Sequence, residues 1–123
     1  MLYKQNQSYE LDEKLFKNPT SEYRAAPFWA WNCKLNKDIL NEQIDIFKKM
    51  GFGGFHMHSR IGMSTPYLKD EFMGLIKFCT QKAEQENMLA YLYDEDRWPS
   101  GSAGGYVTKT HKYRQRYLIF SQP

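Results

Sequence analysis

The sequence predicts an α/β fold with a parallel sheet, and three observations lead to this prediction. Short apolar stretches alternate with segments of helical periodicity, in the order strand, helix, strand, helix, strand, over residues 27–93. The connections between them are short, as is typical of βα units. Polar and charged side chains follow each apolar stretch, and in parallel sheets this is the edge where ligands bind.

The first predicted strand and helix occupy residues 27–50. Residues 27–32 form a short apolar run, which we expect to be a strand buried on both faces. Asn36 is a suitable N-cap for the helix, and Asp38 lies in the first turn, where the helix dipole favours an acid. Gly51 then provides a typical stop signal at the C′ position.

The second predicted strand covers residues 52–58, and its glycines suggest close packing against a neighbouring backbone. A second helix is predicted for residues 68–87, with apolar residues on one face. Residues 88–93 are predicted to form a third strand that runs directly into an acidic cluster. A further strand is a possibility for the apolar run at residues 117–120.

The chain divides into a polar lead-in, residues 1–24, and an α/β segment, residues 25–123. A complete eight-stranded barrel needs about 250 residues, whereas this chain supplies only the first few βα units. Two alternatives follow: a small open α/β domain, or the first three βα units of a partial (β/α)8 TIM-type barrel. The end of the sequence, which has no closing helix, favours a truncated barrel whose C-terminal portion is missing.

Composition excludes some classes of function. The net charge is only +3, with acids and bases interspersed, which does not indicate a nucleic-acid binder. No segment is long and apolar enough to suggest a membrane span, and the N-terminus lacks a signal core. Cys33 and Cys79 are far apart and show no metal-binding spacing. From the lack of a signal core and of a membrane span we expect a reducing, cytoplasmic location. Aromatic residues make up 16% of the chain, and exposed aromatic faces suit carbohydrate ligands.

The most informative stretch is the acidic cluster after the third predicted strand. Asp94, Glu95 and Asp96 are consecutive, and Arg97 and Trp98 follow them. Packing does not require three adjacent carboxylates, because like charges repel and burial raises their cost. On strand geometry, the first and third acids share one face and the second points to the other. A sugar-processing or metal-assisted site is predicted here, with a solvated acidic loop as the alternative.

Glycoside hydrolysis requires two carboxyl groups on either side of the bond that is cleaved. Adjacent residues seldom meet this geometry, and no other acid of the chain follows a predicted strand. We therefore expect Glu95 or Asp94 to be catalytic, or to bind substrate, with a partner carboxylate that comes from elsewhere. Trp98 is a candidate stacking plate for a sugar, or a cover for the rim of the sheet.

The second predicted strand places His56 and His58 on one face, because side chains alternate along a strand. With Asp94 or Asp96 they would form a metal site, so a metal-dependent hydrolase is an alternative function. His58 and Arg60 are also suited to an anionic or hydroxyl-rich ligand. A salt bridge between the arginine and the acidic cluster is equally compatible with the sequence.

Several motifs occur together in a fixed order. They are Phe-Trp-Ala-Trp-Asn at residues 28–32, Gly-Phe-Gly-Gly-Phe at 51–55, Met-His-Ser-Arg-Ile-Gly at 57–62, Tyr-Asp-Glu-Asp-Arg-Trp-Pro-Ser-Gly at 93–101 and Ala-Gly-Gly at 103–105. The set resembles the N-terminal part of the catalytic barrel in bacterial glycoside hydrolase-like proteins related to family 106, the α-L-rhamnosidase group. The resemblance covers residues 25–117.

This resemblance implies a TIM-type barrel, hydrolysis of glycosidic bonds in plant or bacterial polysaccharide, and room for a bound calcium ion; no other cofactor is implied. Glu95 and Asp94 are the catalytic candidates, and no residue is assigned to a metal. The substrate-binding candidates are Trp31, Asn32, His58, Arg60, Asp96, Arg97 and Trp98. Two departures concern Asp96-Arg97, where the family has a small residue and an aromatic, and His56, where an aromatic is expected. A third alternative is a non-catalytic carbohydrate-binding module built on Trp98 and Trp31.

Overall fold

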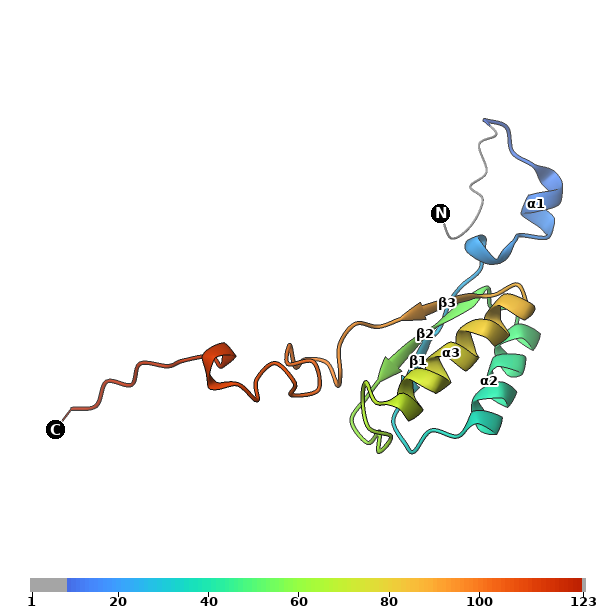
Figure 1. Ribbon diagram of the computed structural model, residues 1–123. Helices are drawn as coiled ribbons and strands as arrows, with labels where there is room; N and C mark the ends of the chain where they lie inside the picture. The colour runs from blue at the N-terminus through green and yellow to red at the C-terminus, as the bar shows by residue number, and fades with distance from the viewer. Residues whose placement is uncertain (1–8, 123) are drawn as a thin grey trace.

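The structure is a computed structural model that describes residues 9–122. It confirms the α/β fold: three parallel strands form one open sheet, and two helices lie on one of its faces (Figure 1). The strands stand in the order β1-β2-β3. The elements are β1 (Phe28–Trp31), α2 (Lys37–Lys49), β2 (Gly54–Ser59), α3 (Asp70–Gln85) and β3 (Leu89–Leu92).

Local signals in the sequence account for the ends of α2. Oδ1 of Asn36 accepts hydrogen bonds from the backbone N–H groups of Asp38, at 2.9 Å, and Ile39, at 3.1 Å. Gly51 follows the last turn with a φ of 84°, a left-handed conformation that favours glycine. Both the predicted N-cap and the predicted stop signal are therefore confirmed.

The core lies between the sheet and the two helices. Trp29 and Trp31 of β1 face the helices, as does Phe55 of β2, and their rings pack edge to face at centroid distances of 5.1 to 5.5 Å. The expectation that β1 is buried on both faces is wrong, because Phe28 is 54% exposed. Both helices cover the same side of the sheet, so β1 alternates between exposed and buried side chains.

The other face of the sheet carries aromatic and imidazole rings, and no helix of the described residues covers it (Figure 1). His56 stacks on Tyr91 with ring centroids 4.5 Å apart. His58 lies between Phe28, edge to face at 4.4 Å, and Tyr93, stacked at 3.9 Å. The prediction that both histidines share one face is confirmed. We call this surface the open face.

Ion pairs join the two helices at the surface. The ammonium of Lys82 lies 2.9 Å from a carboxylate oxygen of Asp45 on α2 and 2.9 Å from one of Glu86. Lys48 of α2 also pairs with Glu86, just past the end of α3. These contacts hold the pKa of Glu86 at about 2, mainly through the hydrogen bonds from Lys48 and Lys82.

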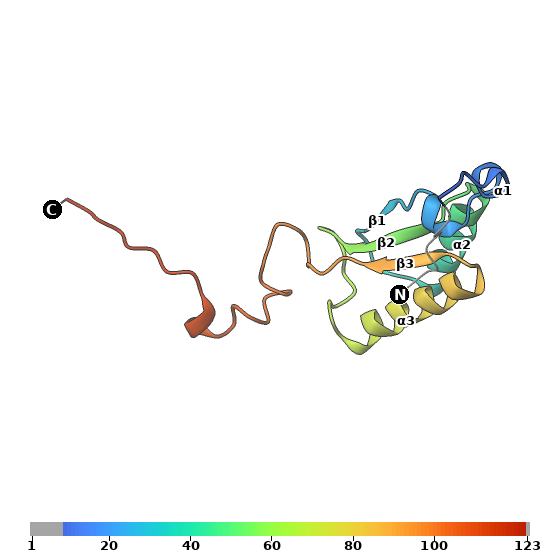
Figure 2. The ribbon, with the colours of Figure 1, turned by 90° about the horizontal axis from the view of Figure 1, so that it is seen from above.

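Short helical turns precede and follow the α/β unit: α1 (Glu13–Lys17), η1 (Ser21–Tyr23) and η2 (His111–Tyr113). Beyond β3 the chain leads away from the sheet, as Figure 2 shows. Residues 117–120 form no strand, so the further strand suggested for them is wrong. Their side chains are exposed, and their backbone does not join the sheet. Within residues 9–122, no helix has the length and apolar character needed to cross a membrane.

Candidate functional site

The loops that follow the three strands meet at the carboxyl edge of the sheet. The backbone N–H of Arg60 donates to the carbonyl of Trp31 at 2.9 Å, just after β1 and β2 end. The N–H of Arg97 donates to the carbonyl of Ser59 at 3.1 Å. Strand pairing therefore continues into the loops, and it brings the three segments that follow the strands to one edge of the sheet.

Asp96 is buried at this edge, with only 3% of its surface exposed. Oγ of Ser59 donates a hydrogen bond to its Oδ1, and Nη1 of Arg97 lies 2.8 Å from its Oδ2. Nη2 of Arg97 also donates to the carbonyl of Met63 at 3.1 Å. Asp96 and Arg97, both expected to bind substrate, are thus committed to partners within the protein.

Glu95 is held differently. Its Oε1 accepts hydrogen bonds from the backbone N–H groups of Ser100 and Gly101, so the loop folds back onto the carboxylate. These backbone donors are the main reason why the pKa of Glu95 lies below its usual range. The ionised form of the carboxylate is therefore favoured.

The rule of alternating faces does not extend to the acidic cluster. Strand β3 ends at Leu92, and residues 94–99 form a succession of bends in which Asp96 turns inward while Asp94 is exposed. The expectation that these two aspartates share a strand face is therefore wrong. Trp98 lies on the same loop and is 53% exposed.

The remaining sequence-predicted residues divide between the edge and the core. Asn32 is exposed directly after β1, and Arg60 is half-buried directly after β2. Trp31 is 2% exposed and packs against Phe72, with ring centroids 5.8 Å apart, on the helix side of the sheet. Its indole cannot stack on a ligand at the edge, so we leave it out of the candidate site.

His58 is 2% exposed, and neither of its ring nitrogens has a hydrogen-bond partner among the described residues. Burial is the main cause that lowers its pKa below 6.5, and the nearby charge of Arg60 acts in the same direction. The negative charge of Glu95 opposes the shift to a smaller extent. A neutral imidazole is therefore held close to the carboxyl edge.

The residues present do not form a metal site. Within residues 9–122, no three histidine, cysteine, aspartate or glutamate side chains lie close enough together to hold an ion. His56 and His58 each stack on a tyrosine instead of converging on an aspartate. Among the described residues, this arrangement gives no support to a metal-dependent hydrolase that uses the two histidines.

Sequence reasoning missed the partners that organise this edge. Ser59, Ser100 and Gly101 supply the hydrogen-bond donors to Asp96 and Glu95, although each belongs to a motif noted in the sequence. Tyr67 was also missed. Burial and the nearby carboxylates, Asp96 first among them, raise its pKa, which records the negative potential of the site.

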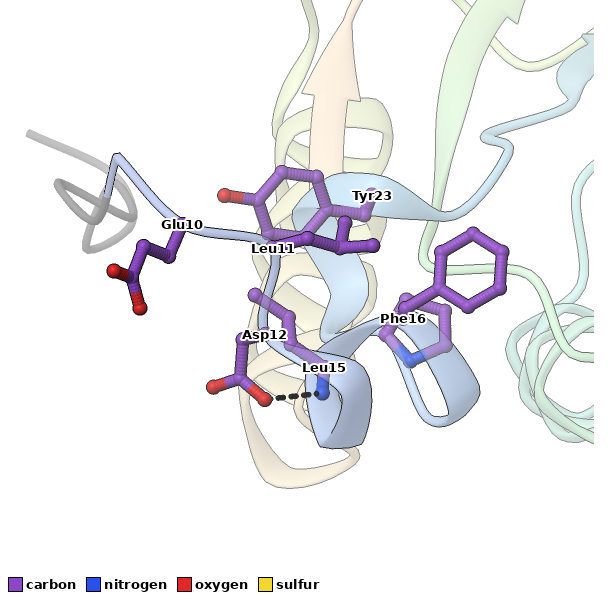
Figure 3. Close-up of a pocket in the computed structure, with 7 residues that line it drawn as sticks. Glu10, Leu11, Asp12, Leu15, Phe16 and Tyr23 are labelled. Carbon is purple, nitrogen blue, oxygen red and sulfur yellow. Dashed lines mark hydrogen bonds between the residues drawn. The ribbon is translucent and has the colours of Figure 1, made fainter.

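A separate cavity of about 400 Å³ lies in the lead-in (Figure 3). The helix α1, which contributes to its lining, lies beyond the amino ends of the strands (Figure 1). Its lining includes Leu11, Leu15, Phe16 and Tyr23. The carboxylate of Asp12 accepts hydrogen bonds from the N–H groups that open α1, so it serves as the N-cap of that helix (Figure 3). This cavity is mainly apolar and is remote from the carboxyl edge.

No family model and no characterised protein matches this sequence. Among solved structures, the fold is similar to that of a rhamnosidase from Novosphingobium sp. PP1Y, with a TM-score of 0.60 and 23% sequence identity. The similar region covers 70% of this chain and 9% of the rhamnosidase. This likeness supports the α/β fold of the described residues. The chain corresponds to only a small part of the length of that rhamnosidase.

Proposed function

We propose that this chain forms part of a glycoside hydrolase-like (β/α)8 barrel and binds a sugar at the carboxyl edge of its strands. One observation carries the proposal: the ionised carboxylate of Glu95 is fixed by two backbone amides on the same loop as the exposed ring of Trp98. The fold likeness to a rhamnosidase supports the same class of ligand.

This geometry suits the chemistry of a sugar. A carboxylate that is already fixed can accept hydrogen bonds from hydroxyl groups with little further ordering, and a flat indole covers the C–H face of a pyranose ring. Asn32 and Arg60 add donors from the two neighbouring loops. Asp94 is exposed and Glu95 is half-buried, and Arg60 forms no ion pair with a carboxylate among residues 9–122. This excess of negative charge at the edge favours a neutral sugar over an acidic one.

The pKa of Glu95 limits its role in hydrolysis. A general acid must carry a proton at working pH, whereas the backbone donors stabilise the ionised form of this group. We therefore assign Glu95 to hydroxyl binding, or to stabilising positive charge as the glycosidic bond breaks. The proton donor would be another carboxyl group, Asp94 or a residue from the rest of the barrel.

The open face supports a barrel. In a (β/α)8 barrel one face of every strand points to the interior and helices cover the other face only. The three strands described here show this asymmetry, and His58 has unpartnered nitrogens on the helix-free side. We propose that residues 25–123 are the N-terminal segment of such a barrel and that a C-terminal portion completes it.

Substrate and location complete the proposal. The likeness to a rhamnosidase makes an α-L-rhamnoside the first ligand to test, with cleavage of the glycosidic bond confined to the completed barrel. We also propose a cytoplasmic location, in keeping with two free cysteines, Cys33 and Cys79.

Tryptophan fluorescence tests sugar binding. Trp29 and Trp31 are buried and Trp98 is exposed, so an added aqueous quencher reports on Trp98. Methyl α-L-rhamnoside should protect this signal in a saturable manner, whereas methyl β-D-glucoside should protect it less. Protection should be lost in Glu95→Gln and kept in Glu84→Gln, an exposed change at the far end of α3. Failure of every sugar to protect Trp98 would refute the proposed site.

A further inference from the structure

The buried carboxylate of Asp96 lies between two parts of the chain. Oγ of Ser59, the last residue of β2, donates to Oδ1, and Nη1 of Arg97 donates to Oδ2 at 2.8 Å. Both oxygens therefore have partners, as burial of a charged group demands. We refer to Ser59, Asp96 and Arg97 as the Asp96 cluster.

Arg97 extends this cluster to the loop after β2. Its Nη2 donates to the carbonyl of Met63 at 3.1 Å, and its backbone N–H donates to the carbonyl of Ser59 at 3.1 Å. Its φ is 53°, in the left-handed region that is unfavourable for a residue with a Cβ. Such a conformation persists where surrounding contacts determine it, and here the contacts are those of Asp96 and Met63.

The backbone of Asp96 also fixes the loop whose amides bind the Glu95 carboxylate. Oγ of Ser100 donates to the backbone carbonyl of Asp96 at 2.6 Å. From that position, the backbone N–H groups of Ser100 and Gly101 donate to the carboxylate of Glu95. The donors that surround Glu95 are thus attached to a segment whose one buried anchor is Asp96.

We propose that Asp96 and Arg97 are positioning residues that hold the loop of residues 95–101 in the conformation that presents the Ser100 and Gly101 amides to Glu95. This rests on the proposed function in treating Glu95 as the sugar-binding carboxylate. It replaces direct sugar binding by Asp96 and Arg97 with an indirect role.

Two electrostatic effects of Asp96→Asn differ in sign, which makes the variant a sharp test. Loss of a neighbouring negative charge alone would lower the pKa of Glu95, because its ionised form would meet less repulsion. Loss of the amide donors would raise that pKa toward its usual range. Asp94→Asn is the matched control, since it removes an adjacent charge that is exposed and outside the Asp96 cluster.

The measurement is a carboxyl carbon NMR titration of Glu95 in the full chain, without any sugar. We expect the pKa of Glu95 to rise in Asp96→Asn and to fall slightly or stay unchanged in Asp94→Asn. The amide resonances of Ser100 and Gly101 should follow the Glu95 titration in the wild type and cease to do so in Asp96→Asn. An unchanged or lowered pKa in a folded Asp96→Asn protein would overturn the proposal.

Ser59→Ala provides a second route if Asp96→Asn does not fold. It removes one donor to Asp96 and leaves the pair with Arg97 intact, so a partial rise in the Glu95 pKa is expected. Folded Ser59→Ala protein with a Glu95 titration identical to wild type would also overturn the proposal. Because no sugar is present, this result is independent of whether a rhamnoside binds.

Discussion

The ring of Tyr93 stacks on the imidazole of His58, with centroids 3.9 Å apart and the planes 21° from parallel. Phe28 packs edge to face against the same imidazole, with ring centroids 4.4 Å apart. A buried imidazole without hydrogen-bond partners is costly, and a protonated one in the same place would cost more. Burial therefore favours neutral His58 at the boundary between the open face and the carboxyl edge.

The lowered pKa of His58 predicts that acid weakens the fold. The unfolded chain takes up a proton near pH 6.5, while folded His58 takes it up only at lower pH. Its stabilising contribution is therefore complete above pH 6.5 and is lost as the pH falls below that value. Urea unfolding from about pH 7.5 to about pH 5.5 should show a falling free energy of unfolding.

His58→Phe should remove this pH dependence, because phenylalanine fills the stack and does not titrate. His111→Gln is the matched control, since His111 is exposed and outside the sheet. An equally steep loss of stability in His58→Phe would show that other groups cause the acid sensitivity.

The two tryptophans expected to bind sugar should respond differently to truncation. Trp31 is 2% exposed in the core, so Trp31→Ala should cost about 3–5 kcal/mol of stability. Trp98 is 53% exposed, so Trp98→Ala should cost about 1 kcal/mol or less. Calorimetric titration with methyl α-L-rhamnoside should nevertheless show that Trp98→Ala weakens binding in the folded protein. Wild-type affinity in Trp98→Ala would show that the indole of Trp98 does not contact the sugar.

Much of the α/β unit was predictable because its signals are local. The cap at Asn36 and the stop at Gly51 act within one turn of α2, and both were read directly from the sequence. Burial on one face of β1 was not predictable in the same way. The pattern of Trp29 and Trp31 with Phe28 and Ala30 is apolar throughout, and only the placement of both helices on one side decides which residues are covered.

The candidate site was predictable by location and less so by role. Short connections between parallel strands placed Asn32, Arg60 and the acidic cluster at one edge. The inward turn of Asp96 depends on a hydrogen bond from Ser59, 37 residues earlier in the chain, and no periodicity reveals such a contact. Residues 117–120 were expected to form a strand because they are apolar, yet they form none. An apolar composition does not by itself provide a neighbouring strand for pairing.

The ion pairs between α2 and α3 predict a second pH effect, at lower pH. The folded-state pKa of Glu86 is about 2, below its usual value of 4.5, because Lys48 and Lys82 donate to it. Its contribution to stability is present above about pH 4.5 and is lost as the pH falls toward about 2. Glu86→Gln should be less stable than wild type near neutral pH, and the difference should shrink in acid.

Added salt should also reduce the difference between wild type and Glu86→Gln, because the pairs are partly exposed to solvent. Glu84→Gln, two residues earlier at an exposed position, is the control for a general change in charge. Denaturant curves at low and high salt provide the measurement. A difference that neither acid nor salt reduces would mean that Glu86 acts through packing alone.

Two glycines test how closely the loops of the site approach each other. Gly62 has a φ of 101°, and a Cβ there would lie 2.5 Å from the carbonyl oxygen of Asn32. Gly51 also has a positive φ, but a Cβ there would meet nothing within 4 Å. Gly51→Ala should therefore cost about 1–2 kcal/mol for conformation alone, and Gly62→Ala should cost more. Thermal unfolding of both variants measures this difference.

The clash at Gly62 also reaches the candidate site, because the oxygen that must move belongs to Asn32. Displacement of that backbone should change the position of Asn32 at the carboxyl edge and weaken protection of Trp98 by methyl α-L-rhamnoside. Gly51→Ala leaves the carboxyl edge untouched, so it should retain wild-type protection at a temperature where both variants are folded. Equal sugar protection in the two variants would mean that Asn32 does not contribute to binding.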